Sequence, residues 1–160
     1  LSRIESGNMS FHCEDCSAHH FAETVYQTHQ VIILPPVEFI KEFPDEDVTI
    51  HIDRMRLTQV ITNFLGNAKK FTSQGHIKLG YFCDKEKKEI HIFVEDTGAG
   101  IPKEELQMIF ERFYKRNEFV QGVGLGLAIS KVIVEKMNGH IDVQSEVNKG
   151  SRFTAVLPYL

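Results

Sequence analysis

The sequence predicts an α/β fold, a two-layer sandwich in which a mixed, mostly antiparallel sheet carries helices on one face. Three observations support this prediction. Helical and strand patterns interleave along the chain, two pairs of strand segments are close enough in sequence to form hairpins, and the 160 residues are 42% apolar. A chain of this length and composition can bury a core without disulfides, and one domain is the default expectation.

The elements are expected in a definite order. Residues 1–10 are interpreted as the end of an upstream element that closes at Gly7-Asn8. A helix is expected from Ser17 to Ile33, ended by Pro35-Pro36, and it is followed by strands at Val37–Phe43 and Val48–Ile52.

The strongest helical pattern runs from Asp53 to Phe71. Asp53 is a favourable N-cap residue. The apolar residues recur at helical spacing and form one stripe: Leu57, Val60, Ile61, Phe64, Leu65 and Ala68. This helix is expected to pack its apolar stripe against the sheet.

The second half of the chain alternates strands and helices. Alternating apolar residues predict strands around Ile77–Tyr81 and Ile90–Val94, joined by the charged loop 84–89. A helix is expected to start at Pro102, with the apolar stripe Leu106, Ile109, Phe110 and Phe113. A glycine cluster then opens a helix that stops at Asn138-Gly139, and strands Ile141–Gln144 and Arg152–Leu157 form the last hairpin.

Composition excludes some functions. The chain has 18 Lys+Arg and 22 Asp+Glu, a formal net charge of −4, which argues against a nucleic-acid partner. Its longest apolar run, Val31–Leu34, is far shorter than the about 20 residues needed to cross a bilayer, and no secretory signal opens the chain. Three Cys favour reduced thiols and a cytoplasmic location. Because the chain begins at Leu1, it is interpreted as a fragment of a longer protein.

Asn63, Asn67 and Lys70 are candidate ligand-binding residues. Their spacing places them on one face of the helix 53–71. Amide oxygens suit a hydrated magnesium ion that shares phosphate oxygens with its substrate, and an ammonium group suits phosphate. The alternative is an ordinary solvated helix face.

The segment Asp96-Thr-Gly-Ala-Gly-Ile-Pro102 follows a predicted strand. Its glycines would allow the backbone to approach a flat ligand, and the Asp96 carboxylate could accept a hydrogen bond from an exocyclic amine such as that of adenine. The alternative is a turn that leads into the next helix.

Gly122, Gly124 and Gly126 alternate just before a predicted helix, whose N-terminal amides could hold phosphate. Their spacing fits neither a Rossmann fingerprint nor a Walker A loop, and the H-R-D and D-F-G motifs of protein kinases are absent from the sequence. The alternative is a flexible turn. The cations Arg112, Lys115 and Arg116 could reach a γ-phosphate or could simply cap the end of a helix.

Taken together, these motifs resemble the catalytic, ATP-binding domain of bacterial sensor histidine kinases, which has the Bergerat ATP-binding fold. Residues 56–72 resemble the N box, Asp96–Pro102 the first glycine box, Ile109–Lys115 the F box, and Gly122–Ile129 the second glycine box. Gly150-Ser-Arg-Phe resembles the small box near the last strand. The resemblance covers the chain from about residue 10, so residues 11–160 are expected to be the catalytic domain and residues 1–10 the tail of the dimerisation helix.

The resemblance implies ATP and magnesium as cofactors, and it implies a role for each matching residue. Asn67 would ligate magnesium, Asn63 would contact phosphate or water, and Lys70 would contact phosphate. Phe71, Asp96, Gly98, Gly100, Ile101, Leu125 and Leu127 would surround adenine. Gly122, Gly124 and Gly126 would surround the phosphates, with Lys115 and Arg116 at the γ-phosphate.

Relatives that hydrolyse ATP carry Glu at the position of Asn63 as a general base, and an amide cannot accept a proton at neutral pH. The resemblance therefore implies phosphoryl transfer to a histidine. None of the eight His stands in the family's H-E-x-x-x-P setting, so the acceptor is expected in a dimerisation domain outside this chain. The implied parent is a homodimeric, membrane-anchored sensor that signals to a response regulator.

Three alternatives remain open at this stage. The shared motifs also fit a Bergerat-type ATPase or chaperone module. Lys115, Gln121 and Val123 depart from the family pattern, which would fit a degenerate, non-enzymatic nucleotide sensor. Finally, His12-Cys13-x-x-Cys16-x-x-His19-His20 contains possible zinc ligands but lacks a distant second pair.

Overall fold

A computed structural model of the chain describes residues 10–111 and 126–160. Its main sheet has the strand order β2-β4-β5-β7-β6. The strands are β2 (Val37–Glu42), β4 (Gly75–Asp84), β5 (Glu89–Asp96), β6 (His140–Glu146) and β7 (Gly150–Pro158). The β2–β4 pair is parallel and the other neighbouring pairs are antiparallel.

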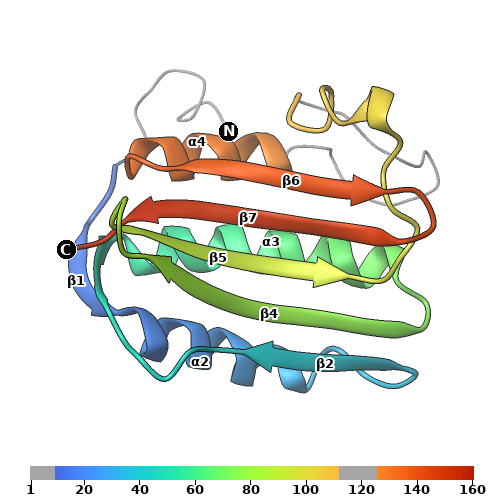
Figure 1. Cartoon of the computed structure of the whole chain (residues 1–160), viewed down its shortest axis with the longest axis horizontal. Helices are drawn as coiled ribbons and strands as arrows, with labels where there is room; N and C mark the ends of the chain where they lie inside the picture. The colour runs from blue at the N-terminus through green and yellow to red at the C-terminus, as the bar shows by residue number, and fades with distance from the viewer. Residues whose placement is uncertain (1–9, 112–125) are drawn as a thin grey trace.

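Helices α2 (Ala18–Gln30), α3 (Arg54–Phe71) and α4 (Gly126–Lys136) all lie on one side of the main sheet (Figure 1). The opposite side of the sheet carries no helix in the part of the chain that the structure describes. The predicted two-layer α/β sandwich is therefore confirmed. None of the helices among the described residues is long and apolar enough to span a membrane.

Helix α3 forms where its sequence pattern predicts. The Asp53 carboxylate accepts a hydrogen bond from the backbone N–H of Arg56 at 3.1 Å, as an N-cap does. All six residues of the predicted apolar stripe are buried against the sheet and the neighbouring helices. This packing turns the polar face that carries Asn63, Asn67 and Lys70 towards α4.

Helix α2 is shorter than predicted. It begins after Ser17, whose hydroxyl caps the backbone N–H of His20 at 3.0 Å, and it ends at Gln30 rather than Ile33. The N–H groups of Ile32 and Ile33 both donate to the carbonyl of His29, which closes the helix in a tight turn before Pro35-Pro36.

A small second sheet was not expected. It pairs β1 (Glu14–Ser17) antiparallel with β3 (Thr49–Ile52). Strand β1 has the sequence Glu-Asp-Cys-Ser and buries only Cys16, so no alternating apolar pattern predicts this strand. Among the described residues, the possible zinc ligands of this region form no group of three or more side chains close enough to hold one metal ion. Cys13 is exposed and Cys16 is buried.

Both predicted hairpins are present, β4–β5 and β6–β7, and their strands extend slightly beyond the predicted limits. Alternate residues of the central strands face the helices and are buried; among these are Ile77, Leu79, Tyr81, Ile90, Ile92 and Val94. On the other face, Phe93 is also buried, because the Arg152 guanidinium lies 4.0 Å from the centre of its ring.

The α-helix predicted from Pro102 does not form. The structure has only a 3-10 turn, η1 (Lys103–Glu105), followed by further turns up to Glu111. Their bonds span three residues, as from Met108 N–H to the Glu105 carbonyl at 2.9 Å. Side chains three apart eclipse in this geometry, so Leu106 and Ile109 can share one inward face without a full helix. Phe113 lies outside the described residues.

Candidate functional site

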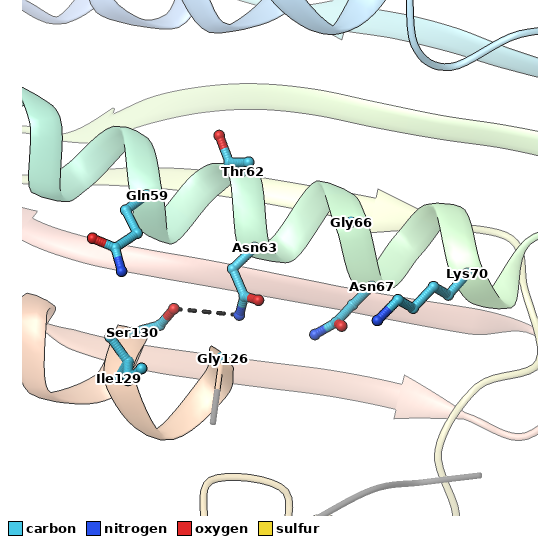
Figure 2. Close-up of a pocket in the computed structure, with 9 residues that line it drawn as sticks. All are labelled: Gln59, Thr62, Asn63, Gly66, Asn67, Lys70, Gly126, Ile129 and Ser130. Atoms are coloured by element: carbon cyan, nitrogen blue, oxygen red, sulfur yellow. Dashed lines mark hydrogen bonds between the residues drawn. The ribbon is translucent and has the colours of Figure 1, made fainter. Parts of the chain in front are cut away.

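Helices α3 and α4 enclose a pocket of about 330 Å³ between them (Figure 2). It is lined from α3 by Gln59, Thr62, Asn63, Gly66, Asn67 and Lys70, and from α4 by Gly126, Ile129 and Ser130. The predicted face of α3 therefore meets the first turn of α4, where backbone N–H groups lack helical partners. Such a helix start favours an anionic ligand.

Two residues of α4 contact the Asn63 side chain in this pocket. Its Nδ2 donates a hydrogen bond to Ser130 Oγ at 3.4 Å. Its Oδ1 faces Gly126 so closely that an ideal Cβ at that residue would lie 2.2 Å from the oxygen. Gly126 thus contributes to the site by having no side chain, which lets α4 approach the Asn63 amide.

Asn67 and Lys70 follow Asn63 along α3 towards its C-terminal end. Figure 2 shows both side chains on the α4 side of the helix, with the Lys70 amine extended towards Asn67. The two amide oxygens fit a magnesium ion that binds mainly through phosphate and water oxygens, and the ammonium group fits the phosphate itself. The three residues that sequence spacing grouped are therefore together in the structure.

Asp96 ends strand β5 and is 8% exposed. Its Oδ1 accepts a hydrogen bond from the backbone N–H of Gly98 at 2.8 Å, which orients the carboxylate over its own turn. The turn is tied to the end of α3, because Ala99 N–H donates to the Phe71 carbonyl at 3.2 Å. A Cβ at Gly98 would lie 2.3 Å from that carbonyl oxygen, so only glycine fits there.

The small box near the last strand packs against the same turn. Gly150 has φ of +116°, and a Cβ there would lie 1.9 Å from the Asp96 carbonyl oxygen. Asn148 N–H donates to the Ala99 carbonyl at 2.8 Å, and Asn148 adopts a positive φ of 67°. Asparagine tolerates this left-handed conformation better than most residues with a side chain.

Some of the remaining predicted site residues are described by the structure, and others lie outside the described residues. Gly100 is buried with φ of +73°, Ile101 belongs to the core, and Leu127 packs against that core at the start of α4. The Ile101 N–H donates to Ser145 Oγ at 2.7 Å, which anchors this end of the turn to β6. Six candidate site residues lie outside the described part of the chain: Arg112, Lys115, Arg116, Gly122, Gly124 and Leu125.

Four polar residues of this region were not singled out from the sequence. Gln59, Thr62 and Ser130 line the pocket. Thr72 is 5% exposed, and its Oγ1 has no hydrogen-bond partner among the residues that the structure describes. Ser130 could have been noticed, because a serine interrupts the apolar stripe of α4 four residues after Gly126. Thr72 has no comparable sequence signal.

The chain matches a family model over residues 52–160, described as "Histidine kinase-, DNA gyrase B-, and HSP90-like ATPase". This match covers the pocket, the Asp96 turn and the whole main sheet except β2. The chain therefore belongs to this ATPase family, and its fold is the catalytic ATP-binding fold expected from the motifs.

Two named relatives are a sensor histidine kinase and a sensor protein. The chain is 34% identical over 99% of its length to "Sensor histidine kinase WalK" of Bacillus subtilis, and 44% identical over 66% of its length to "Sensor protein SrrB" of Staphylococcus aureus. It covers 27% of the first relative and 19% of the second, so it corresponds to a minor part of each.

Solved structures agree with this assignment. Full-length ShkA in complex with AMPPNP superposes with a TM-score of 0.89 at 26% identity, covering 99% of this chain and 33% of ShkA. The catalytic domain of histidine kinase ThkA in a nucleotide-free form superposes with a TM-score of 0.81 at 28% identity, covering 92% of this chain and 96% of that domain.

Proposed function

We propose that this chain is the ATP-binding catalytic domain of a sensor histidine kinase, which binds Mg-ATP and transfers the γ-phosphoryl group to a histidine on a separate dimerisation domain. The observation that carries the proposal is the pocket in which Asn63, Asn67 and Lys70 of α3 face the start of α4. The sensor kinases among the relatives, and the bound AMPPNP in one similar structure, support it.

In this proposal the Asp96 turn binds the base. The buried carboxylate can accept a hydrogen bond from the adenine amino group. Gly98 and Gly100 let the turn pack against the carbonyls of Phe71 and Glu146, which holds the backbone of the turn in place beside the base. Phe71, Ile101 and Leu127 are the described apolar residues near this turn and the start of α4 that would contact adenine. Leu125 is assigned the same role from the sequence alone.

The phosphates would lie between α3 and the start of α4. Asn67 would ligate magnesium, and Lys70 would hold phosphate as a point charge. When bound, magnesium would neutralise charge on the phosphate oxygens during transfer. Backbone N–H groups for the phosphates would come from Gly122, Gly124 and Gly126. The γ-phosphate would be reached by Lys115 and Arg116. Of these five residues only Gly126 is described by the structure, and the other four are assigned from the sequence motifs.

Asn63 favours transfer over hydrolysis. An amide cannot act as a general base towards water at neutral pH, so catalysis would consist of positioning and charge neutralisation. The acceptor histidine, the homodimer contact and the receiver domain of a response regulator would then be partners of a longer parent protein. We also propose that residues 1–10 are the tail of the dimerisation helix, residues 11–160 the catalytic domain, and the parent a membrane-anchored sensor.

The proposal is tested by joining this chain to its natural upstream segment and incubating the product with γ-labelled ATP and Mg²⁺. We expect acid-labile, base-stable label on a histidine and negligible steady-state hydrolysis by the isolated chain. Rapid hydrolysis by the isolated chain would instead favour an ATPase or chaperone module. Nucleotide binding with no label in the extended protein would favour the non-enzymatic sensor.

A further inference from the structure

Ser130 is a polar residue in the part of α4 that packs inward. It is 2% exposed, and the other buried residues of the helix, Ile133 and Val134, are apolar. Burying a hydroxyl without a partner is unfavourable, whereas burying it with a hydrogen bond is tolerated. The partner it has is Asn63 Nδ2, at 3.4 Å across the interface between α4 and α3.

This hydrogen bond bears on which atom of the Asn63 amide faces the ligand. With Nδ2 turned to Ser130, Oδ1 lies on the side of the pocket towards Asn67 (Figure 2). An oxygen there can accept hydrogen bonds from magnesium-bound water or ligate a cation, whereas the opposite rotamer would present an N–H₂ group that repels one. A serine inside a helix commonly donates its own proton to a carbonyl one turn earlier, which leaves its lone pairs for an amide donor.

We propose that Ser130 is a positioning residue that holds the Asn63 amide with its oxygen towards the Mg-nucleotide. The inference rests on the proposed function, because it assumes that the pocket binds Mg-ATP. Gly126 and Ser130 stand four residues apart, on one face of α4, so both meet the same amide. Gly126 makes room for the oxygen, and Ser130 holds the nitrogen.

The experiment compares binding of AMPPNP by calorimetry, with Mg²⁺ and with EDTA, in the wild-type chain, Ser130→Ala, Asn63→Ala and the double variant. We expect Ser130→Ala to weaken binding about threefold to tenfold with Mg²⁺, the worth of one hydrogen bond, and less than twofold with EDTA. In the Asn63→Ala background the serine substitution should have no further effect, because Ser130 acts through that amide.

Two further variants separate positioning from packing. Ser130→Cys keeps nearly the same volume but is a weak acceptor, and it should behave like Ser130→Ala. Thr28→Ala removes a helix hydroxyl of α2 that bonds to the Thr24 carbonyl, and it should leave binding unchanged. Melting temperatures show that each variant is folded.

Three results would overturn the inference: wild-type affinity in Ser130→Ala with Mg²⁺, an equal loss with EDTA, or a loss that persists in the Asn63→Ala background. Full binding by Ser130→Cys would likewise reduce the role of Ser130 to packing. A wild-type chain that does not bind AMPPNP at all would overturn the proposed function itself, which distinguishes the two failures.

Discussion

Asn63 Oδ1 and the α-carbon of Gly126 are in such close contact that a Cβ at residue 126 would lie 2.2 Å from the oxygen. This contact joins a glycine of the second glycine box to an asparagine of the N box, two motifs separated by about 50 residues of sequence. The approach of α4 to α3, and with it the width of the pocket, depends on the absence of a side chain at that position.

Gly126→Ala should therefore widen or distort the α3–α4 interface. We expect a loss of about 1–3 kcal/mol in the free energy of unfolding, typical of overpacking, and at least tenfold weaker AMPPNP binding. Urea unfolding and calorimetry measure the two effects. The matched control for stability is Gly66→Ala in α3, where a Cβ meets nothing within 4 Å, and it should stabilise the chain by about 0.5–1 kcal/mol. Equal stability of the two variants would contradict the structural account.

Thr72→Val tests the buried hydroxyl without a partner. Thr72 Oγ1 is buried next to Gly98, and its desolvation is not offset by a hydrogen bond. We expect Val, which has nearly the same shape, to raise the free energy of unfolding by about 1 kcal/mol and Tm by about 2–4 °C. Thr97→Val is the control, because Thr97 Oγ1 accepts from His76 N–H at 3.0 Å, and that variant should lose stability. Destabilisation of both variants to the same extent would refute the explanation.

Asp96→Asn should abolish binding of adenine nucleotides without unfolding the chain. Asn keeps an oxygen that can accept from Gly98 N–H, so the turn can persist. Its N–H₂ group, however, can face the adenine amino group with donor against donor. Calorimetry should show at least a hundredfold loss of affinity for ATP, while circular dichroism stays unchanged. Unchanged affinity would mean that the base binds elsewhere.

Asn67→Ala tests the magnesium assignment. If its amide oxygen ligates the ion, the substitution removes a ligand and should reduce ATP affinity selectively when Mg²⁺ is present, by about 10–100-fold. In EDTA the variant and the wild type should bind alike. Titration of Mg²⁺ at fixed ATP measures the effect directly, and an equal loss under both conditions would assign Asn67 to general packing of the pocket.

Acid stability depends in part on Asp53. Burial alone would raise the pKa of its carboxyl group, but hydrogen bonds from the backbone N–H groups of His12 and Arg56 and the positive charge of Arg56 outweigh burial and lower this pKa below its usual value. A lowered folded-state pKa means that the stabilisation is complete above the unfolded pKa, about 4, and is lost as pH falls through the folded pKa.

Asp53→Asn keeps a capping oxygen and removes only the charge. The wild type should therefore be more stable than this variant by up to about 1 kcal/mol at pH 7, and the difference should disappear towards pH 2. Urea unfolding at both pH values measures the change. A difference that is the same at pH 7 and at low pH would show that the charge of Asp53 contributes nothing.

Much of the fold could be predicted because its signals are local. Helix α3 has an N-cap, an apolar stripe and a polar face that all follow from spacing within one segment, so Asn63, Asn67 and Lys70 could be grouped without any structure. The same holds for the β4–β5 hairpin and for the turn at Asp96. The prediction of an α-helix after Pro102 was wrong, because apolar residues spaced three apart, such as Leu106 and Ile109, also suit 3-10 turns.

The sequence by itself indicated which residues are candidates for the site, since motif identity and helical spacing are properties of the chain alone. The tertiary structure decided how these residues meet. The pairing of β1 with β3, the seating of Gly150 against Asp96, and the approach of Gly126 and Ser130 to Asn63 each join segments distant in sequence. Such contacts depend on how the helices pack on the sheet, and no periodicity within one segment encodes that packing.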